Sequence, residues 1–136
     1  MTTFTIKTNN DTFTIETESG VYLAYKKDGI TIINADTVKK HIKERNSHQL
    51  AELGKYVEAD RLVFEELTEE YTILADDDGA YEGNNSYMLF FGDGKAHLIM
   101  GDFIVARLDS QGNAIPLTEE DVAILHAKLS IYCSRD

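Results

Sequence analysis

The stretch VYLAYKKDGITII, residues 21–33, has two apolar runs on either side of a polar turn. Asp28-Gly29 between two such runs is a strong short-range signal for a β-hairpin. Residues 21–25 and 30–33 are therefore expected to form two antiparallel strands. This hairpin indicates a fold built at least partly on antiparallel sheet.

An imperfect repeat precedes this hairpin. The segment TFTIKT, residues 3–8, is followed by TFTIET, residues 12–17. In both copies Phe and Ile alternate with Thr, so the apolar side chains share one face of a strand. Asn9-Asn10-Asp11 between the copies suits a turn. The repeat predicts a second hairpin, close to the N-terminus.

The C-terminal half contains three apolar runs of strand length, residues 87–91, 96–100 and 103–108. Turns that contain Gly-Asp separate them, as in an antiparallel meander. Residues 114–117 are expected to add a short edge strand, because Pro116 lacks the N–H group that a central strand needs.

Two helices are predicted between the N-terminal and C-terminal strands. The first begins at residues 34–36, with Asp36 as its N-cap, because an aspartate can accept hydrogen bonds from the N–H groups of the first turn. The second, for which Ser47 is a suitable cap, is marked by an apolar stripe at helical spacing: Leu50, Leu53 and Val57.

A last helix is predicted near the C-terminus. It begins at Thr118, and Asp121 stands three positions later in a variant of the capping box. Its buried face is expected to contain four apolar residues: Val122, Leu125, Leu129 and Tyr132.

Residues 59–75 are ambiguous. A helix is favoured up to Glu70, because Glu and Leu are good helix formers. The segment RLVFE, residues 61–65, could equally form a strand. A short strand at 71–74 and a loop over residues 76–86 are expected to follow.

The order of elements is strands, helices, strands, helix, which is typical of the α+β class. We expect one domain, residues 1–136, with a mostly antiparallel, twisted sheet made from N-terminal hairpins and a C-terminal meander. Two to three helices are expected to pack on one face of that sheet.

The charge of the chain is concentrated in its middle. Residues 1–57 have seven acids and eight bases, a net charge of +1, and residues 83–136 have seven acids and four bases, a net charge of −3. Residues 58–82 have ten acids and one base, a net charge of −9, out of −11 for the chain. Such a balance argues against direct binding to nucleic acid or anionic membranes and favours a basic partner.

Cellular location is indicated by two features. Cys133 is the only cysteine, so no internal disulfide can form. The sequence shows no secretory signal and no apolar run long enough for a transmembrane helix. We therefore predict a cytoplasmic protein with no membrane association.

The sequence contains no complete motif for metal binding, nucleophilic catalysis or phosphate binding. Placing Gly79 at the sixth position of a calcium loop puts Leu74 at the first and Asn85 at the twelfth, where oxygen ligands are needed. Weak calcium binding through Asp76, Asp78 and Glu82 is the alternative to a solvated turn. The histidines lack zinc spacing, and no nucleophile motif or complete phosphate loop is present. We predict no catalytic residue, metal site or cofactor.

The acidic segment is the candidate partner-binding site. If residues 58–70 are helical, Glu58, Glu65 and Glu69 project to one side, and a dense row of carboxylates can approximate the phosphate spacing of DNA. The alternative is a solvated face that keeps the chain in solution. The candidate contacts are ten acids and two tyrosine anchors: Glu58, Asp60, Glu65, Glu66, Glu69, Glu70, Tyr71, Asp76, Asp77, Asp78, Tyr81 and Glu82.

Three functional hypotheses follow. The leading one is a small non-enzymatic protein that binds and occludes a basic partner, either a nucleic-acid-handling enzyme or a toxin. Two classes of protein act in this way: immunity proteins, and inhibitors that phages make against host defence. The analogy with them rests on the physical mode of binding alone. The alternatives are a small-ligand-binding domain or enzyme with a pocket between sheet and helices, and a structural or oligomeric accessory subunit.

Overall fold

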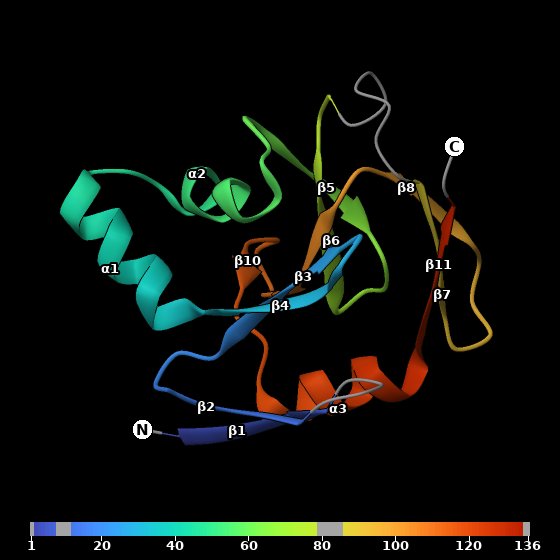
Figure 1. Cartoon of the computed structure of the whole chain (residues 1–136), viewed down its shortest axis with the longest axis horizontal. Coiled ribbons are helices and arrows are strands. Elements are labelled where there is room, and N and C mark those ends of the chain that lie inside the picture. Colours follow the sequence, from blue (N-terminus) through green and yellow to red (C-terminus); the bar gives the residue numbers. More distant parts are fainter. Residues whose placement is uncertain (1, 8–11, 79–85, 135–136) are drawn as a thin grey trace.

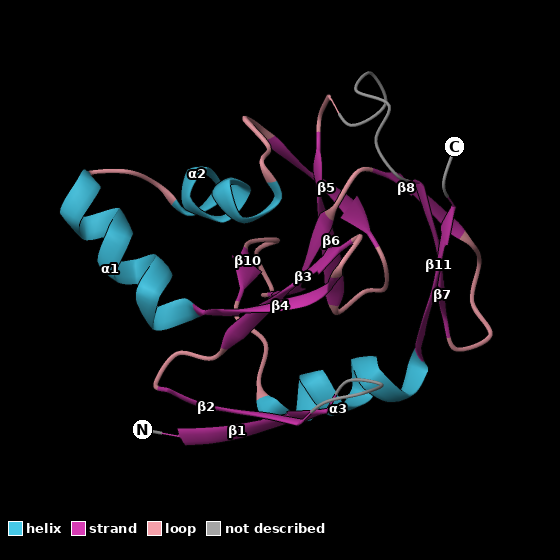
Figure 2. Cartoon of the chain, in the orientation of Figure 1, coloured by secondary structure: helices cyan, strands magenta, loops and turns pink. Residues whose placement is uncertain are grey.

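The computed structural model describes residues 2–7, 12–78 and 86–134. Figures 1 and 2 show the arrangement of its helices and strands. The elements along the chain are β1 (Thr2–Lys7), β2 (Thr12–Thr17), β3 (Val21–Lys26), β4 (Gly29–Asn34), α1 (Ala35–Arg45), α2 (Gln49–Gly54), the 3-10 turn η1 (Lys55–Val57), β5 (Leu62–Glu66), β6 (Tyr71–Asp76), β7 (Ser86–Phe91), β8 (His97–Met100), β9 (Phe103–Leu108), β10 (Ala114–Ile115), α3 (Glu119–Lys128) and β11 (Leu129–Ser134).

The strands form three antiparallel sheets. The central sheet has the order β4-β3-β9-β6-β5, and β10 pairs with β9 beside it. A two-stranded sheet contains β1 and β2, and a three-stranded sheet has the order β11-β7-β8. The predicted α+β class with antiparallel sheets is confirmed.

Both predicted N-terminal hairpins are present. Strands β3 and β4 pair from Val21 opposite Asn34 to Lys26 opposite Gly29, and Gly29 has a φ of 134°, a conformation that glycine adopts readily. In the repeat, Phe4 lies opposite Ile15 in β1–β2. The turn predicted at Asn9-Asn10-Asp11 lies outside the described residues.

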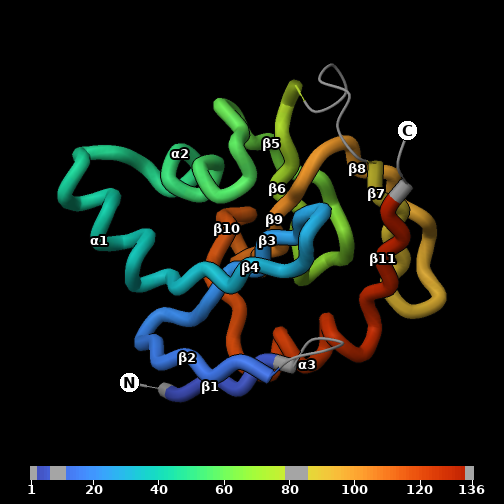
Figure 3. Tube along the Cα trace, in the orientation of Figure 1, coloured from blue at the N-terminus to red at the C-terminus, as the bar shows by residue number. Residues whose placement is uncertain are grey.

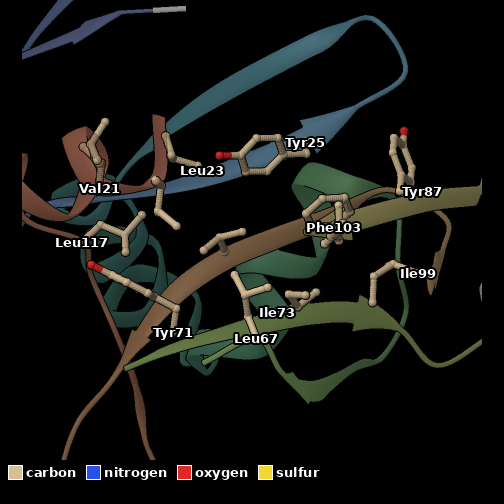
Figure 4. Close-up of a cluster of buried hydrophobic side chains, with 14 of the residues drawn as sticks. Val21, Leu23, Tyr25, Leu67, Tyr71, Ile73, Tyr87, Ile99, Phe103 and Leu117 are labelled. Carbon is tan, nitrogen blue, oxygen red and sulfur yellow. The ribbon is translucent and has the colours of Figure 1, made fainter. Parts of the chain in front are cut away.

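Two buried clusters lie on the two faces of the central sheet. One face of β3, β6 and β9 packs against α1 and α2 through residues such as Val38 and Leu53. The other face packs against β1, α3 and the three-stranded sheet, and Figure 4 shows part of this cluster. There, Phe103 stacks on Tyr25 with ring centroids 5.1 Å apart and meets Tyr87 edge-on at 5.3 Å.

The helices are therefore divided between the two faces of the sheet, whereas the sequence led us to expect them on one face. Helices α1 and α2 cover one face, and Val122 and Leu125 of α3 belong to the opposite cluster. Figure 3 shows α3 beside the β1–β2 hairpin. The reason is that both faces of β3, β6 and β9 are apolar, so each face must be covered.

The helix ends differ in part from the predictions. Asn34, not Asp36, caps α1: its side-chain oxygen accepts from the Asp36 N–H group at 2.9 Å, while Asp36 itself accepts from the N–H groups of Glu18 and Ser19. The cap of α2 is His48 and not Ser47. The capping box of Thr118 and Asp121 is confirmed.

The last helix is shorter than predicted. It ends at Lys128, and residues 129–134 form β11, which pairs along the whole of β7. Leu129 still packs against the core, but Tyr132 is 63% exposed and belongs to no buried helical stripe. This segment is a strand because pairing with β7 provides hydrogen-bond partners for its backbone N–H and C=O groups, and this outweighs its helix propensity.

No described helix has both the length and the apolar character needed to cross a bilayer.

Candidate partner-binding edge

The segment predicted as an acidic helix is a β-hairpin, so that prediction is wrong. Strand β5 pairs with β6 from Leu62 opposite Asp76 to Glu66 opposite Thr72. Strand β6 is bonded on its other side to β9, and Leu62 and Leu74 are buried in the cluster under α2. Burial and pairing with the central sheet outweigh the helix propensity of Glu and Leu, and the strand alternative for RLVFE is confirmed.

Strand β5 is an edge strand of the central sheet. One end of it leads into the turn 67–70, where four exposed carboxylates gather: Glu65, Glu66, Glu69 and Glu70. The Thr68 hydroxyl oxygen accepts from the N–H groups of Glu70 and Tyr71, at 3.1 and 3.0 Å, and this closes the turn. The turn geometry therefore fixes the backbone that carries these glutamates.

A second group of carboxylates lies at the other end of the hairpin. The Asp77 N–H group donates to the Arg61 carbonyl at 3.0 Å, so the segment after β6 runs beside the segment before β5. Asp76 accepts from the Asp78 N–H group at 3.0 Å. This end carries five acids: Glu58, Asp60, Asp76, Asp77 and Asp78.

The two acidic ends are separated by the length of β5. Five residues at about 3.4 Å per step span roughly 14 Å from Leu62 to Glu66. Phe64 lies in the middle of this edge and is 44% exposed. We call this region the acidic edge and define it by the nine described acids of the two groups together with Phe64. The sequence analysis did not identify Phe64 as a candidate contact. The strand alternative for RLVFE could have pointed to it, because an edge strand exposes some of its side chains.

The helical row of Glu58, Glu65 and Glu69 does not exist. In a strand, neighbouring side chains point to opposite faces, so Glu65 and Glu66 project to different sides of the sheet. The comparison of a helical carboxylate row with DNA phosphates loses its geometric basis. The acids nevertheless stay together along one edge of the central sheet.

The acids of this edge are almost all without a basic partner. Among the described residues, Asp77 is the one member of the set in an ion pair, with Arg61 at 3.7 Å, and both of these side chains are exposed. Strand β4, which leads into the basic helix α1, is the opposite edge of the sheet. In Figure 1, α2 lies between α1 and β5.

Arg45 of α1 and Lys55 of η1 are engaged away from the acidic edge. The buried carboxylate of Glu52 accepts from Arg45 at 2.8 Å and from Lys55 at 3.1 Å. A hydrogen bond from Ser47, together with the charges of these two bases, lowers the pKa of Glu52 despite its burial. Arg45 and Lys55 thus link α1, α2 and η1 through Glu52 and form no ion pair with the acidic edge.

Of the two proposed tyrosine anchors, Tyr71 is described and does not lie at this surface. Tyr71 is 2% exposed, and its hydroxyl donates to Asp121 at 2.7 Å. Burial, then the bond to Asp121 and that residue's charge, raise the pKa of Tyr71. Tyr71 is thus a core residue, and Tyr81 lies outside the described residues, as does Glu82.

Comparisons of the chain with protein families, curated proteins and solved structures found no match. Within residues 2–7, 12–78 and 86–134, no group of three or more His, Cys, Asp or Glu side chains is placed to hold a metal ion. The candidate site therefore rests on charge and geometry alone.

Proposed function

We propose that this protein is a non-enzymatic interaction protein whose acidic edge binds a basic protein and occludes its working surface. The observation that carries the proposal is the concentration of nine carboxylates on the β5–β6 hairpin and the segments that flank it, with one ion pair among them in the described part of the chain. Holding like charges together opposes folding, and a cationic partner would relieve that repulsion.

The layout of the edge favours a partner protein over a small cation. The two acidic ends are roughly 14 Å apart, a span that a protein surface can cover. Phe64 between them offers an apolar contact inside a charged rim, the usual arrangement of a protein interface. Attraction between the charges would speed encounter, and Phe64 would add contact once the surfaces meet.

The basic partner is proposed to be a nucleic-acid-handling enzyme or a toxin, because proteins of the former kind carry the cationic surface that this edge complements. Occlusion by the edge would then block access of the partner's own anionic substrate. The cytoplasm is the proposed location, since the chain has one cysteine and cannot form an internal disulfide.

Capture at controlled salt tests this proposal. The immobilised protein is expected to retain basic proteins from a cell lysate at about 0.05 M salt and to release them as salt rises to about 0.5 M, because screening shortens the reach of exposed charges. Added duplex DNA is expected to compete for a nucleic-acid-handling partner. Retention of the same proteins at high salt, or capture of acidic proteins only, would contradict the proposal.

A further inference from the structure

The outer face of the three-stranded sheet is mostly apolar, although Ser86 and Ser130 also belong to it. In β7, Tyr87 and Leu89 are buried toward the core, and the alternation of a strand turns Met88 and Phe90 to the other side. The register places Tyr132 of β11 and Leu98 of β8 directly opposite Met88, one on each side. A row of three apolar side chains thus crosses the sheet.

Two more residues extend this row. The ring of Phe90 meets Tyr132 edge-on, with centroids 6.0 Å apart, and Met100 lies two positions after Leu98 on the same face of β8. Leu98 is 59% exposed and Tyr132 is 63% exposed, the two largest values among the exposed large hydrophobic residues. We call this surface the outer apolar face: Met88, Phe90, Leu98, Met100 and Tyr132.

The outer apolar face carries no formal charge. Residues 86–91, 97–100 and 129–134 contain no Asp, Glu, Lys or Arg, although the chain as a whole has a net charge of −11. Two copies of such a chain repel each other, and the repulsion is weakest where an uncharged surface on each copy can meet. A charged partner, by contrast, would gain no ion pair on this face and would leave its own charge desolvated.

We propose that the outer apolar face pairs with the same face of a second copy of this chain. A two-fold axis parallel to β7 and passing over Met88 exchanges the two ends of the row. Tyr132 of one copy then lies on Leu98 of the other, and Met88 meets Met88, so an aromatic ring packs on an aliphatic side chain at both ends. Two sheets stacked in this way at about 10 Å resemble an ordinary β-sandwich contact.

The proposed dimer is a weak one. Five partly exposed side chains make a patch of a few hundred Å², below the roughly 800 Å² per partner of a stable interface. The dimer is therefore expected to form and dissociate with concentration. It does not depend on the acidic edge, which belongs to the central sheet.

Sedimentation equilibrium of the full chain tests this inference. We expect a monomer–dimer equilibrium whose association strengthens as salt rises from about 0.1 to about 0.5 M, because salt screens the repulsion between two anionic chains. Leu98→Glu is expected to weaken the dimer at least tenfold. Leu98→Lys is expected to weaken it also, although lysine lowers the net negative charge, because either charge would be buried at the interface.

Ile30→Glu is the matched control, since Ile30 is an exposed hydrophobic residue of β4 and the change adds the same charge. It is expected to leave dimerisation within about twofold of the native chain, and circular dichroism is expected to show the native spectrum for all three variants. A chain that stays monomeric up to about 1 mM overturns the inference. Equal weakening by Ile30→Glu and Leu98→Glu also overturns it, as does a dimer unaffected by both Leu98 variants.

Discussion

Binding of the proposed basic partner is expected to fall by about 1000-fold when the four glutamates at one end of the acidic edge become lysine: Glu65, Glu66, Glu69 and Glu70. An exposed ion pair contributes up to about 1 kcal/mol, and reversing a charge replaces that attraction with repulsion. Four reversals then remove about 4 kcal/mol, which corresponds to roughly three powers of ten in the dissociation constant. Isothermal titration of partner into each protein measures the loss.

The fold is expected to survive these changes. All four side chains are exposed, no ion pair of theirs is present among the described residues, and lysine is well suited to an edge strand. The free energy of unfolding by urea should change by less than about 1 kcal/mol.

A charge-matched variant separates the site from the net charge. Four other exposed glutamates, away from the acidic edge, serve for this variant: Glu16, Glu18, Glu44 and Glu120. Their reversal to lysine also brings the net charge from −11 to −3, since each reversal adds two positive charges. This control is expected to lose less than about tenfold in affinity, through weaker long-range steering. Equal losses in the two variants would show that binding depends on overall charge and not on the acidic edge.

Asp121→Ala is expected to lower the free energy of unfolding by about 3–5 kcal/mol. Asp121 is 4% exposed, and one of its oxygens accepts from the Tyr71 hydroxyl at 2.7 Å. The other oxygen accepts from the N–H and hydroxyl of Thr118, at 2.8 and 2.9 Å, and lies 3.5 Å from Arg107. The change therefore removes the Asp121 half of the capping box and leaves the buried Tyr71 hydroxyl without its acceptor.

Two control variants show how much of this loss comes from the Tyr71 hydrogen bond and how much from the acidic charge in the first turn of α3. Tyr71→Phe removes one donor but keeps both halves of the capping box of α3, so it is expected to lower the free energy of unfolding by only about 1–2 kcal/mol. Glu120→Gln alters an exposed acid in the same helical turn and is expected to cost less than about 1 kcal/mol. Urea unfolding of the three variants measures these values, and a cost for Asp121→Ala no larger than that of Glu120→Gln would contradict this account of the cluster.

The contribution of Asp121 to the free energy of unfolding is expected to depend on pH. Burial tends to raise the pKa of Asp121, but the hydrogen bonds from Thr118 and Tyr71 and the charge of Arg107 outweigh it and lower the pKa below its ordinary value. A lowered pKa in the folded state means that the stabilisation is full above about pH 4 and is lost as pH falls through the folded-state pKa. The difference in unfolding free energy between the native chain and Asp121→Asn should therefore be constant from about pH 5 to 7 and shrink below pH 4.

The parts of the fold that the sequence predicts well are those decided locally. Asp28-Gly29 and the Phe/Ile alternation set the two N-terminal hairpins, because turn geometry and strand period act over a few residues. The capping box of Thr118 and Asp121 is likewise local. These features depend on no distant partner.

The segments whose predicted conformation is wrong depend on distant partners. Residues 62–66 and 129–134 both have sequences compatible with helix, but each pairs with a strand that already belongs to a sheet. The N-cap of α1 lies two residues from its predicted position because Asp36 is used instead to hold the N–H groups of Glu18 and Ser19. The pairing and the hydrogen bonds across the fold outweigh local preference.

The sequence predicts that the candidate site is acidic, but it does not predict how the acids are arranged in space. The uneven distribution of acids along the chain is enough to single out residues 58–82. Their division between two ends of an edge strand follows from the pairing of β5 with β6, which the charge pattern does not reveal. Tyr71 is not the anchor that the sequence suggests, because its burial depends on β9 and α3, which lie more than thirty residues further along the chain.

The most direct test of the acidic edge is amide hydrogen exchange of the full chain with and without its captured basic partner. Slower exchange on binding is expected in residues 58–78, above all in β5 and the turn 67–70, because an edge strand and an exposed turn exchange readily until they are covered. Exchange in α1 should not change. Protection confined to α1 or to the three-stranded sheet, with β5 and its turn unaltered, would contradict the proposed role of the acidic edge.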